Sequence, residues 1–335
     1  MRVLLTGGSG YIGSNTALSL LDAGYELIIF DNLSNSSANV INQINKISGK
    51  VVKFVKGDIR DTKHLMSTLH ENKVSAVVHL AGLKAVGQSV TDPLTYYENN
   101  VAGTYSLLRA MEGASVSNLV FSSSATVYGY PNSIPIDESH DVAPINPYGI
   151  TKQHVEVFLS DLCYAKPDLS VMSLRYFNPV GAHISGTVGE APISEPNNIM
   201  PYIVQVAAGK LERFTIYGND YDTKDGTGVR DYLHVTDLAL GHVSALEWVK
   251  KNKGFETVNL GTGSGVSVLE LIKTFESTTG RKIPYVIGKR RRGDVGECFA
   301  NCDKASYLLG WKAKYSLGEM CQGAWDFQLW KDENS

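Results

Sequence analysis

Two side chains suited to acid–base chemistry stand four residues apart near the middle of the sequence. They are Tyr148 and Lys152 of the segment Tyr-Gly-Ile-Thr-Lys, and on a helix this spacing places them one turn apart on the same face. A phenol with its ordinary pKa of about 10 is a poor base at neutral pH, but a neighbouring ammonium group favours the phenolate. We therefore predict that Tyr148 is a general acid/base for an alcohol and that Lys152 lowers its pKa.

A run of three serines precedes this pair and supplies a third polar group. Ser124 ends the run Ser122-Ser123-Ser124, where the chain is expected to leave a strand, and its hydroxyl could hydrogen-bond the reacting alcohol. A Tyr-x-x-x-Lys spacing alone arises often by chance on a surface helix. The chemical interpretation therefore depends on the serines and on a cofactor site elsewhere in the chain.

A glycine-rich loop near the start of the chain provides that cofactor site. Gly7, Gly10 and Gly13 follow an apolar run, and such a loop brings bare backbone and a helix N-terminus close to a pyrophosphate. Asp31, at the end of the next predicted strand, can accept hydrogen bonds from the adenine ribose and would repel a 2′-phosphate, which favours NAD over NADP. Asp58 follows the third predicted strand, where it could either contact the adenine or cap the next helix.

Alternating strands and helices must position these residues. The sequence predicts strands at 2–5, 26–30, 51–55, 76–80, 118–122 and 170–174, and helices at 12–23, 61–69, 93–111 and 147–164. This order is typical of βαβ units, so we predict an α/β fold with a Rossmann-type, doubly wound parallel sheet. After residue 177 the composition changes, and only short strands follow, at 214–217 and 257–260. We therefore expect an NAD-binding domain over residues 1–177 and a smaller mixed α/β substrate lobe over 178–335, interleaved with the first.

Composition and charge exclude several classes of function. The 335 residues carry a net charge of −3, which argues against nucleic acid as a partner, because phosphate backbones recruit strongly basic surfaces. No segment approaches the ~20 consecutive apolar residues of a membrane span. The apolar stretch near the N-terminus is also too short for the core of a signal peptide, so we expect a cytoplasmic protein without a membrane partner. The four cysteines form no Cys-x-x-Cys pair, and Cys298 and Cys302 lack further ligands at metal-binding spacing, so we expect no metal.

Taken in order, these motifs resemble the extended short-chain dehydrogenase/reductase family and, within it, the UDP-glucose 4-epimerases. The similarity covers essentially the whole chain and is most specific in residues 6–13, 81–87, 122–129, 175–182 and 226–234. It implies tightly bound NAD and a UDP-hexose substrate. It also implies the activity, which is the reversible inversion of C4 between UDP-glucose and UDP-galactose through a transient 4-keto sugar.

The glycine loop and the resemblance together define the expected site. The residues expected to hold NAD are Gly7, Gly10, Tyr11, Ile12, Gly13, Asp31, Asn32, Asn35, Asp58, Ile59, Ala81, Lys84, Asn99, Ser122, Tyr148, Lys152 and Phe177. The residues expected to contact the UDP-sugar are Lys84, Ser124, Tyr148, Asn178, Asn198, Ile199, Tyr217, Arg230, Arg291, Asp294 and Cys298. Arginine suits a diphosphate because its planar fork donates two hydrogen bonds at once. The arginine run at 290–292 would, however, look the same as a solvated basic turn.

The implied reaction has no net redox change. Tyr148 takes the proton of the sugar 4-hydroxyl while C4 gives its hydride to bound NAD. The 4-keto sugar then turns about its link to the diphosphate, and the hydride returns to the other face. Such a turn requires weak contacts to the hexose and firm binding of UDP, so that remote binding energy anchors the reactant.

Three alternatives remain open on the sequence alone. Nucleotide-sugar 4,6-dehydratases resemble this chain but carry acidic residues directly after the serine position, where Ala125 and Thr126 stand here, so dehydration is disfavoured. Another NAD-dependent nucleotide-sugar oxidoreductase would have to exchange its cofactor at every turnover, which no residue excludes. A catalytically silent NAD-binding regulator would not need Ser124, Tyr148 and Lys152, and their presence together argues against it.

One position bears on the choice of sugar. In the family that the chain resembles, the position of Cys298 borders the hexose pocket. A tyrosine there is typical of enzymes restricted to glucose and galactose, whereas a small residue goes with room for a 2-acetamido group. We therefore expect UDP-GlcNAc and UDP-GalNAc to be interconverted as well. The alternative is that Cys298 is a small buried filler, as free cysteines commonly are.

The resemblance also suggests a homodimer in which two helices pair with their copies in a four-helix arrangement. Apolar residues recur at helical spacing in both segments, namely Tyr97, Val101, Tyr105 and Leu108 in the first, and Val155, Phe158, Leu159 and Leu162 in the second. Such stripes could equally be ordinary core faces, so the sequence leaves both interpretations open.

Overall fold

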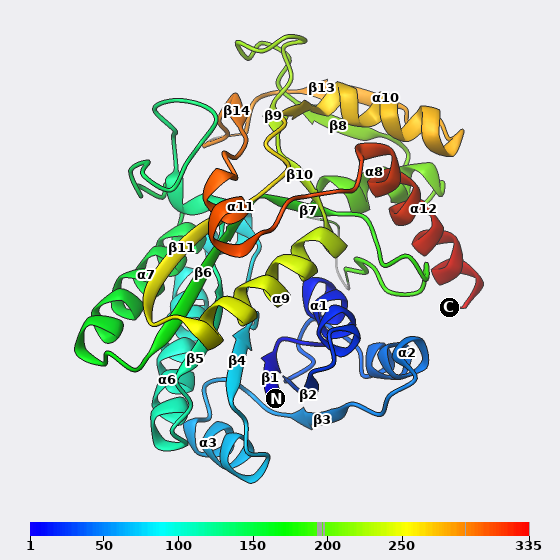
Figure 1. The fold of residues 1–335 in the computed structure, drawn as a ribbon. Coiled ribbons are helices and arrows are strands. Elements are labelled where there is room, and N and C mark those ends of the chain that lie inside the picture. Colours follow the sequence, from blue (N-terminus) through cyan, green and yellow to red (C-terminus); the bar gives the residue numbers. More distant parts are fainter. Residues whose placement is uncertain (193–195, 197, 292, 335) are drawn as a thin grey trace.

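The computed structural model describes residues 1–192, 196, 198–291 and 293–334, and it shows a parallel sheet covered by helices on both faces (Figure 1). The sheet has seven strands in the order β11-β6-β5-β4-β1-β2-β3. These strands are β1 (Arg2–Thr6), β2 (Glu26–Asp31), β3 (Lys53–Lys56), β4 (Ala76–His79), β5 (Asn118–Ser122), β6 (Ser170–Tyr176) and β11 (Gly254–Leu260). The strand order runs outward from β1 in one direction and from β4 in the other, so the predicted Rossmann-type, doubly wound α/β fold is confirmed.

Burial on both faces explains why the strands are unbroken apolar runs. Val3, Leu4 and Leu5 of β1 are fully buried, with Val3 and Leu5 in the core of one face and Leu4 in the core of the other. The first face is covered by α1 (Tyr11–Asp22), α2 (Asn39–Ser48) and α9 (Val235–Lys251), and the second by α3 (Thr62–Glu71), α6 (Gly103–Gly113) and α7 (Pro147–Ala165). These two cores hold the helices against the two faces of the sheet.

The segment predicted as one helix over 93–111 is three consecutive elements, so that prediction is wrong in detail. They are α5 (Pro93–Tyr96), the π-helical turn η1 (Tyr97–Ala102) and α6. π-turns inside helices are frequent at functional sites. This one contains Asn99, a predicted NAD contact, and the buried Asn100, whose side-chain oxygen accepts a hydrogen bond from the N–H of Leu83 (2.8 Å).

The second half of the chain builds smaller elements and then returns to the main sheet. Besides α9 and β11 it forms β7 (Asn178–Val180), α8 (Ile199–Ala207), β8 (Phe214–Tyr217), β9 (Val229–Arg230), β10 (Tyr232–His234), β12 (Val266–Ser267), α10 (Val268–Thr279), β13 (Tyr285–Gly288), β14 (Glu297–Cys298), α11 (Asp303–Leu309) and α12 (Leu317–Glu333). A third core joins α8, α10 and α12. β11 pairs with β6 along its whole length, so the sheet takes its edge strand from beyond residue 177. The division into two lobes at that residue stays a prediction.

The apolar stripes of the two predicted dimer helices are buried only in part. Leu108, Val155 and Leu159 are buried between the sheet and the helices α6 and α7, which confirms the core interpretation for these residues. Tyr105, another member of the first stripe, is exposed on α6, as is Val157 beside the second stripe on α7. The homodimer stays a prediction.

The described part of the chain also bears on membranes and metals. None of its helices is long and apolar enough to cross a bilayer. Its four cysteines are free, and within the same residues no group of three His, Cys, Asp or Glu side chains could hold a metal ion. The cytoplasmic location stays a prediction.

The burial of α7 gives a stability prediction. Leu159→Ala is expected to lower the free energy of unfolding by about 2–5 kcal/mol, because it leaves a cavity in a packed core. Val157→Ala, on the exposed side of the same helix, is the matched control and should change it by no more than about 0.5 kcal/mol. Urea denaturation followed by circular dichroism measures both. Equal losses in the two variants would contradict the assignment of this face to the core.

Candidate active site

The glycine loop lies at the carboxyl edge of the sheet, between β1 and α1, where ligands bind in open α/β folds. Gly7 adopts a φ of +71°, and a Cβ there would come within 2.7 Å of the nitrogen of Ala81. A Cβ on Gly13 would lie 2.1 Å from the carbonyl oxygen of Gly7, so only glycine permits this tight turn into the helix. No described side chain caps the N-terminus of α1 at Gly10, which leaves its first N–H groups available to an anion.

Asp31 ends β2 beside this loop. Its carboxylate accepts hydrogen bonds from the backbone N–H groups of Ser9 (3.0 Å) and Leu33 (2.8 Å). These bonds tie the negative charge to the glycine loop, at the place where the sequence predicts the adenine ribose. They use part of the acceptor capacity of the carboxylate, since its two oxygens offer about four lone-pair sites.

Asp58 and Asn32 meet at two neighbouring strand ends. Asn32 Nδ2 donates to Asp58 Oδ2 (3.1 Å), and Asp58 pairs with Arg60 (2.9 Å). The hydrogen bonds from Arg60 hold the pKa of the Asp58 carboxyl well below its usual range. The carboxylate that caps α3 is Asp61, which accepts a hydrogen bond from the N–H of His64 (3.0 Å). Of the two interpretations of Asp58, helix capping is therefore wrong, and the adenine contact stays a prediction.

Helix α7 positions the tyrosine and the lysine. Asn146 caps it, because its side chain accepts a hydrogen bond from the backbone three residues on (2.9 Å). The buried phenol of Tyr148 hydrogen-bonds the hydroxyl of Ser124. One turn later, Lys152 Nζ donates to the backbone oxygen of Ser122 (2.7 Å) and lies 5.9 Å from the centre of the Tyr148 ring. The structure thus brings together the residues that the sequence predicts for proton transfer.

Burial controls the proton affinity of this group. It raises the pKa of Tyr148 to about 12, although the hydrogen bond with Ser124 lowers it. It lowers the pKa of Lys152 to about 8, against the charge of Glu156, which raises it. The pKa of Tyr148 therefore shifts in the direction opposite to the prediction, because the phenol loses its hydration and the ammonium group donates to a carbonyl instead. A base role for Tyr148 requires further positive charge beside it.

The residues expected to hold UDP form two groups in the second half of the chain. In one, Arg230 of β9 is paired in register with Cys298 of β14 and lies 3.9 Å from the carboxylate of Asp294. In the other, the guanidinium carbon of Arg291 lies 3.9 Å from the centre of the Tyr217 ring. Each group presents a guanidinium, the cation whose geometry best matches a diphosphate.

Of the two arginines next to Arg291 in the sequence, Arg290 already has a carboxylate partner. Arg290 pairs with Asp220 (2.7 Å) and packs over the ring of Tyr221 at 4.2 Å. Arg292 lies outside the described residues. Within the described part of the run, Arg291 is therefore the better candidate for a ligand contact.

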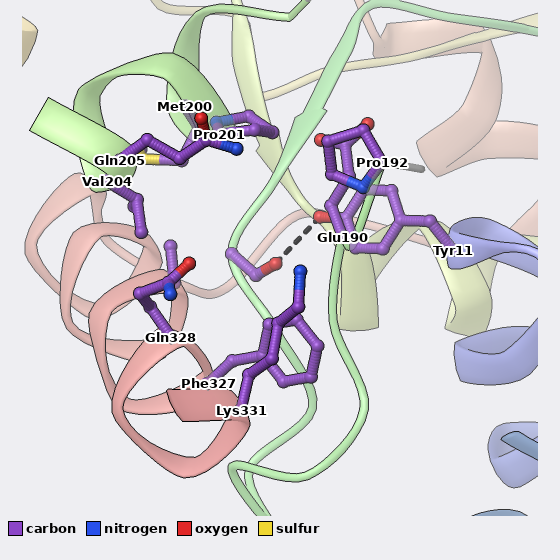
Figure 2. Close-up of a pocket in the computed structure, with 12 residues that line it drawn as sticks. Tyr11, Glu190, Pro192, Met200, Pro201, Val204, Gln205, Phe327, Gln328 and Lys331 are labelled. Carbon is purple, nitrogen blue, oxygen red and sulfur yellow. Dashed lines mark hydrogen bonds between the residues drawn. The ribbon is translucent and has the colours of Figure 1, made fainter. Parts of the chain in front are cut away.

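A carboxylate that the sequence analysis missed links two of the predicted residues. Glu190 accepts hydrogen bonds from Lys84 Nζ (2.7 Å) and Asn198 Nδ2 (2.6 Å). Beside it, the hydroxyl of Tyr11 donates to the carbonyl oxygen of Gly181 (2.8 Å), which joins α1 to the second half of the chain (Figure 2). The pocket drawn in Figure 2 lies between the start of α1, residues 181–192, α8 and α12, and Tyr148 does not line it. No local pattern marks Glu190, because its partner Lys84 is 106 residues away.

Several predicted site residues also have structural partners. Asn99 donates to a backbone carbonyl one turn earlier (2.8 Å), and Asn178 donates to the backbone oxygen of Asp231 (3.1 Å). Ile59 and Phe177 are buried in apolar clusters. The remaining ones, Ile12, Asn35, Ala81 and Ile199, lie in the first turn of α1, after β2, after β4 and at the start of α8.

A second unpredicted carboxylate fixes the loops behind Arg230. Asp231 is fully buried and accepts hydrogen bonds from the N–H groups of Thr262 (2.8 Å), Gly263 (3.0 Å) and Ala300 (3.1 Å). Burial raises the pKa of this carboxyl, and these bonds oppose the shift. The sequence could have indicated Asp231, because it lies within the segment 226–234 on which the family resemblance depends. From that segment, however, only Arg230 was predicted to have a role.

Comparison with known proteins identifies the family. A family model described as GDP-mannose 4,6 dehydratase matches residues 4–324. A Bacillus subtilis protein named UDP-glucose 4-epimerase is 54% identical over 328 residues, which cover 98% of this chain and 97% of that one. The chain belongs to the UDP-glucose 4-epimerases of the extended short-chain dehydrogenase/reductase family.

Solved structures of this epimerase family share the fold and contain the cofactor. The UDP-glucose 4-epimerase of Stenotrophomonas maltophila, solved with NAD and formylated UDP-arabinopyranose, is 47% identical with a TM-score of 0.98, covering 100% of both chains. That of Bifidobacterium longum, solved with NAD⁺ and UDP, is 45% identical with a TM-score of 0.96 and the same coverage. NAD is therefore bound in structures homologous to this chain.

The residues present fit this cofactor. The backbone around Gly7 and Gly13 has no room for a side chain, as a close approach to a pyrophosphate requires. The hydroxyl of Ser9, within the same loop, is buried and has no partner in the described chain. The carboxylate of Asp31 follows at the next strand end, where it suits a ribose.

The fit of the loop gives a prediction for cofactor retention. Gly13→Ala is expected to reduce the NAD carried by the purified protein about tenfold or more, because the new methyl group would displace the loop from the pyrophosphate. Gly318→Ala is the control, since a Cβ there makes only ordinary contact, with Thr278 at 3.6 Å. Bound nicotinamide is measured by absorbance after gel filtration. Full NAD content in a folded Gly13→Ala variant would contradict the assignment of the loop.

Proposed function

We propose that this chain interconverts UDP-glucose and UDP-galactose by inverting C4 with tightly bound NAD. The observation that carries the proposal is the buried set of Ser124, Tyr148 and Lys152 beside a glycine loop. The 54% identity between this chain and a protein named UDP-glucose 4-epimerase supports the proposal. A silent regulator would have no need for a phenol and an ammonium group held together out of water.

The chain's own part in the reaction is proton transfer at the sugar 4-hydroxyl. NAD, when bound, accepts and returns the hydride of C4. Ser124 orients the hydroxyl, and Tyr148 takes its proton as the alcohol is oxidised and returns a proton to the same oxygen as the ketone is reduced. Lys152 supplies a cation 5.9 Å from the phenol ring, and in a site of low dielectric this charge acts strongly on the phenolate.

Binding of UDP is assigned to the second half of the chain. Arg230 and Arg291 lie on or next to β9, β13 and β14, apart from the catalytic helix. They would grip the diphosphate and leave the hexose free to turn, so that remote contacts anchor the intermediate.

Dehydration remains disfavoured. Directly after Ser124 the chain has Ala125, and then Thr126, whose hydroxyl is engaged with Ser124 Oγ (2.9 Å). Neither side chain can act as the acid or base that expels water from C5 and C6. This matters because the family model that matches the chain carries the description of a dehydratase.

Removal of the phenol oxygen of Tyr148 tests the proposed activity. Tyr148→Phe is expected to lower kcat for conversion of UDP-galactose to UDP-glucose by about 10²–10⁴-fold, the usual contribution of an acid/base group. NAD content should stay unchanged. Tyr105→Phe, on the exposed side of α6, is the control. Undiminished conversion by Tyr148→Phe overturns the mechanism, and a wild-type chain that carries NAD but converts nothing favours the silent regulator.

We further propose that the enzyme also interconverts UDP-GlcNAc and UDP-GalNAc. Cys298 is partly exposed, lies in register with Arg230 and packs against the buried cluster that contains Tyr128 and Phe177. Burial raises the pKa of its thiol to about 11, so the side chain is a small neutral group. A small neutral side chain next to the arginine assigned to UDP leaves space for a 2-acetamido group.

Enlarging this side chain tests the sugar range. Cys298→Tyr is expected to abolish turnover of UDP-GalNAc while turnover of UDP-galactose survives, because the ring would fill the space for the acetamido group. Cys298→Ser keeps the side chain small and should preserve the ratio of the two rates. Both rates are measured side by side on the same preparation. Equal losses on the two substrates in Cys298→Tyr would favour the filler interpretation.

A further inference from the structure

A buried arginine outside the proposed chemistry connects two catalytic elements. Arg175 lies on β6 with a side chain only 8% exposed. Its Nε and Nη2 donate to the carboxylate of Glu156 on α7 (3.0 and 2.6 Å), and its Nη1 donates to the hydroxyl of Tyr128 (3.1 Å). The guanidinium carbon also lies 4.9 Å from the centre of the Tyr128 ring. One side chain therefore holds two separate segments.

The first contact of Arg175 ends on the catalytic helix. Tyr148, Lys152 and Glu156 follow one another at intervals of four residues along α7, so they share one face, and all three are buried. The hydroxyl of Ser173 on β6 also donates to Glu156 (2.9 Å). Hydrogen bonds from β6 therefore bind α7 one turn beyond Lys152.

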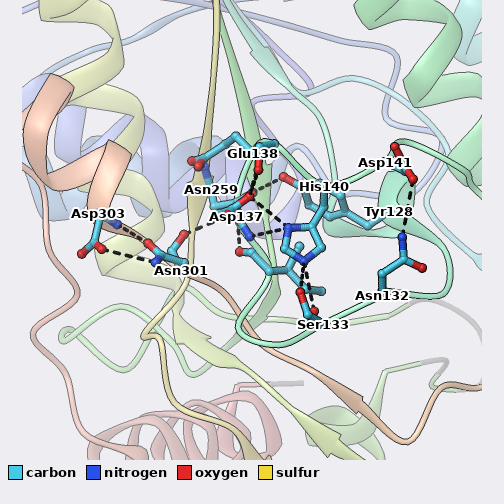
Figure 3. A network of polar contacts seen from close by, with 12 residues as sticks. Tyr128, Asn132, Ser133, Asp137, Glu138, His140, Asp141, Asn259, Asn301 and Asp303 are labelled. Atoms are coloured by element: carbon cyan, nitrogen blue, oxygen red, sulfur yellow. Dashed lines mark hydrogen bonds and ion pairs between the residues drawn. The ribbon is translucent and has the colours of Figure 1, made fainter.

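The second contact ends on the turn of the catalytic serine. Tyr128 is the last residue of the short 3₁₀-helix η2 (Ala125–Tyr128), and Ser124 is its N-cap. The hydroxyl of Tyr128 donates to Asn259 of β11 (2.7 Å), and Asn259 in turn donates to the backbone of Ile136 (2.9 Å) (Figure 3). Arg175 therefore fixes η2 at the end opposite to the serine.

Stability does not account for this ion pair. An apolar pair of similar volume is often as stable as a buried ion pair, because the desolvation of two charges offsets their attraction. What the pair adds is direction, since a planar guanidinium and a carboxylate meet in a defined bidentate geometry. Burial alone would lower the pKa of Arg175, but the hydrogen bonds and charge of Glu156 raise it, so the guanidinium stays charged.

We propose that Arg175 is a positioning residue that holds the helix of Tyr148 and the turn of Ser124 in one fixed geometry. The inference rests on the proposed function, in which both side chains must reach the same sugar hydroxyl. A displacement of about 1 Å in such a site can cost about 10²-fold in rate. Arg175 acts through Glu156 and Tyr128 and leaves the binding of UDP to other residues.

Arg175→Lys removes the planar guanidinium group and keeps the positive charge. We expect kcat to fall by about 10- to 100-fold, while KM for UDP-galactose changes by less than about threefold, since the arginines assigned to UDP are untouched. The matched control is Arg2→Lys, which replaces the guanidinium of the surface pair with Glu26 (2.7 Å) at the amino ends of β1 and β2. Its kcat should stay as in the wild-type chain.

A double variant separates positioning from stability. Arg175→Met with Glu156→Met replaces the ion pair by apolar side chains and should keep the thermal unfolding midpoint near that of the wild-type chain. Its kcat is nevertheless expected to remain about tenfold or more below wild type. A double variant with the wild-type midpoint and a kcat within about twofold of wild type overturns the proposal.

The pH profile of the double variant separates the loss of the Glu156 charge from the loss of positioning. The titratable groups facing Lys152 are Tyr148 and Glu156 on its own helix and His79 on β4, which is uncharged at neutral pH because burial lowers its pKa to about 3. Loss of Glu156 removes the charge that raises the pKa of Lys152. The alkaline limb of kcat should therefore move to lower pH, and a kcat on the pH plateau equal to that of the wild-type chain counts against the proposal.

Tyr128→Phe tests the second contact while the ion pair stays intact. We expect kcat to fall by about 3- to 10-fold without a change in KM, and a folded variant with unchanged kcat overturns the proposal on its own. All variants are compared with the wild-type chain in one assay. A wild-type chain that carries NAD but converts no UDP-galactose refutes the proposed function, whereas active wild type with fully active variants refutes only the positioning role.

Discussion

The removal of the Lys152 ammonium group from water is the constraint on which the rest of the site depends. A lysine this buried stays charged only when its donors are used and a negative charge lies near. The carbonyl of Ser122 takes one donor at 2.7 Å, and Glu156 stands one turn further along the helix. Glu156 needs Arg175 in its turn. The contacts that satisfy a single cation beside the phenol thus join β5 and β6 to α7.

Burial shifts the pKa values of the two members of the proposed catalytic pair in opposite directions. In water a tyrosine and a lysine have pKa values close to each other, near 10. Here burial raises the pKa of Tyr148 to about 12 and lowers that of Lys152 to about 8, because it favours the uncharged form of each group. At rest the site holds a protonated phenol, and a phenolate forms only when more positive charge comes close. The low dielectric that suppresses ionisation also makes such a charge effective once it arrives.

The sequence predicts whatever is decided by near neighbours in the chain. The strands β5 and β8 have the predicted bounds, the Asn146-Pro147 signal starts α7, and the glycine loop turns into α1. Contacts decided by tertiary packing were not predictable, since Arg175 and Lys84 find their carboxylates 19 and 106 residues away. The same cause explains the errors. The helix over 93–111 is interrupted by the π-turn, and the pKa of Tyr148 depends on burial that four-residue spacing cannot reveal.

The halves of the chain are joined beside the dinucleotide loop, and this bears on how an intermediate is retained. Tyr11 reaches the carbonyl of Gly181, and Lys84 reaches Glu190, so residues flanking the cofactor site are tied to the segment that leads into α8. In the proposed reaction the ketone must turn without leaving, which requires that cofactor and diphosphate be held by one frame. The residues proposed to hold them lie in the glycine loop, on α7 and at Arg230 and Arg291. The proposed sugar range places Cys298, a small side chain, beside the hexose, where it would leave space for a sugar that has to rotate.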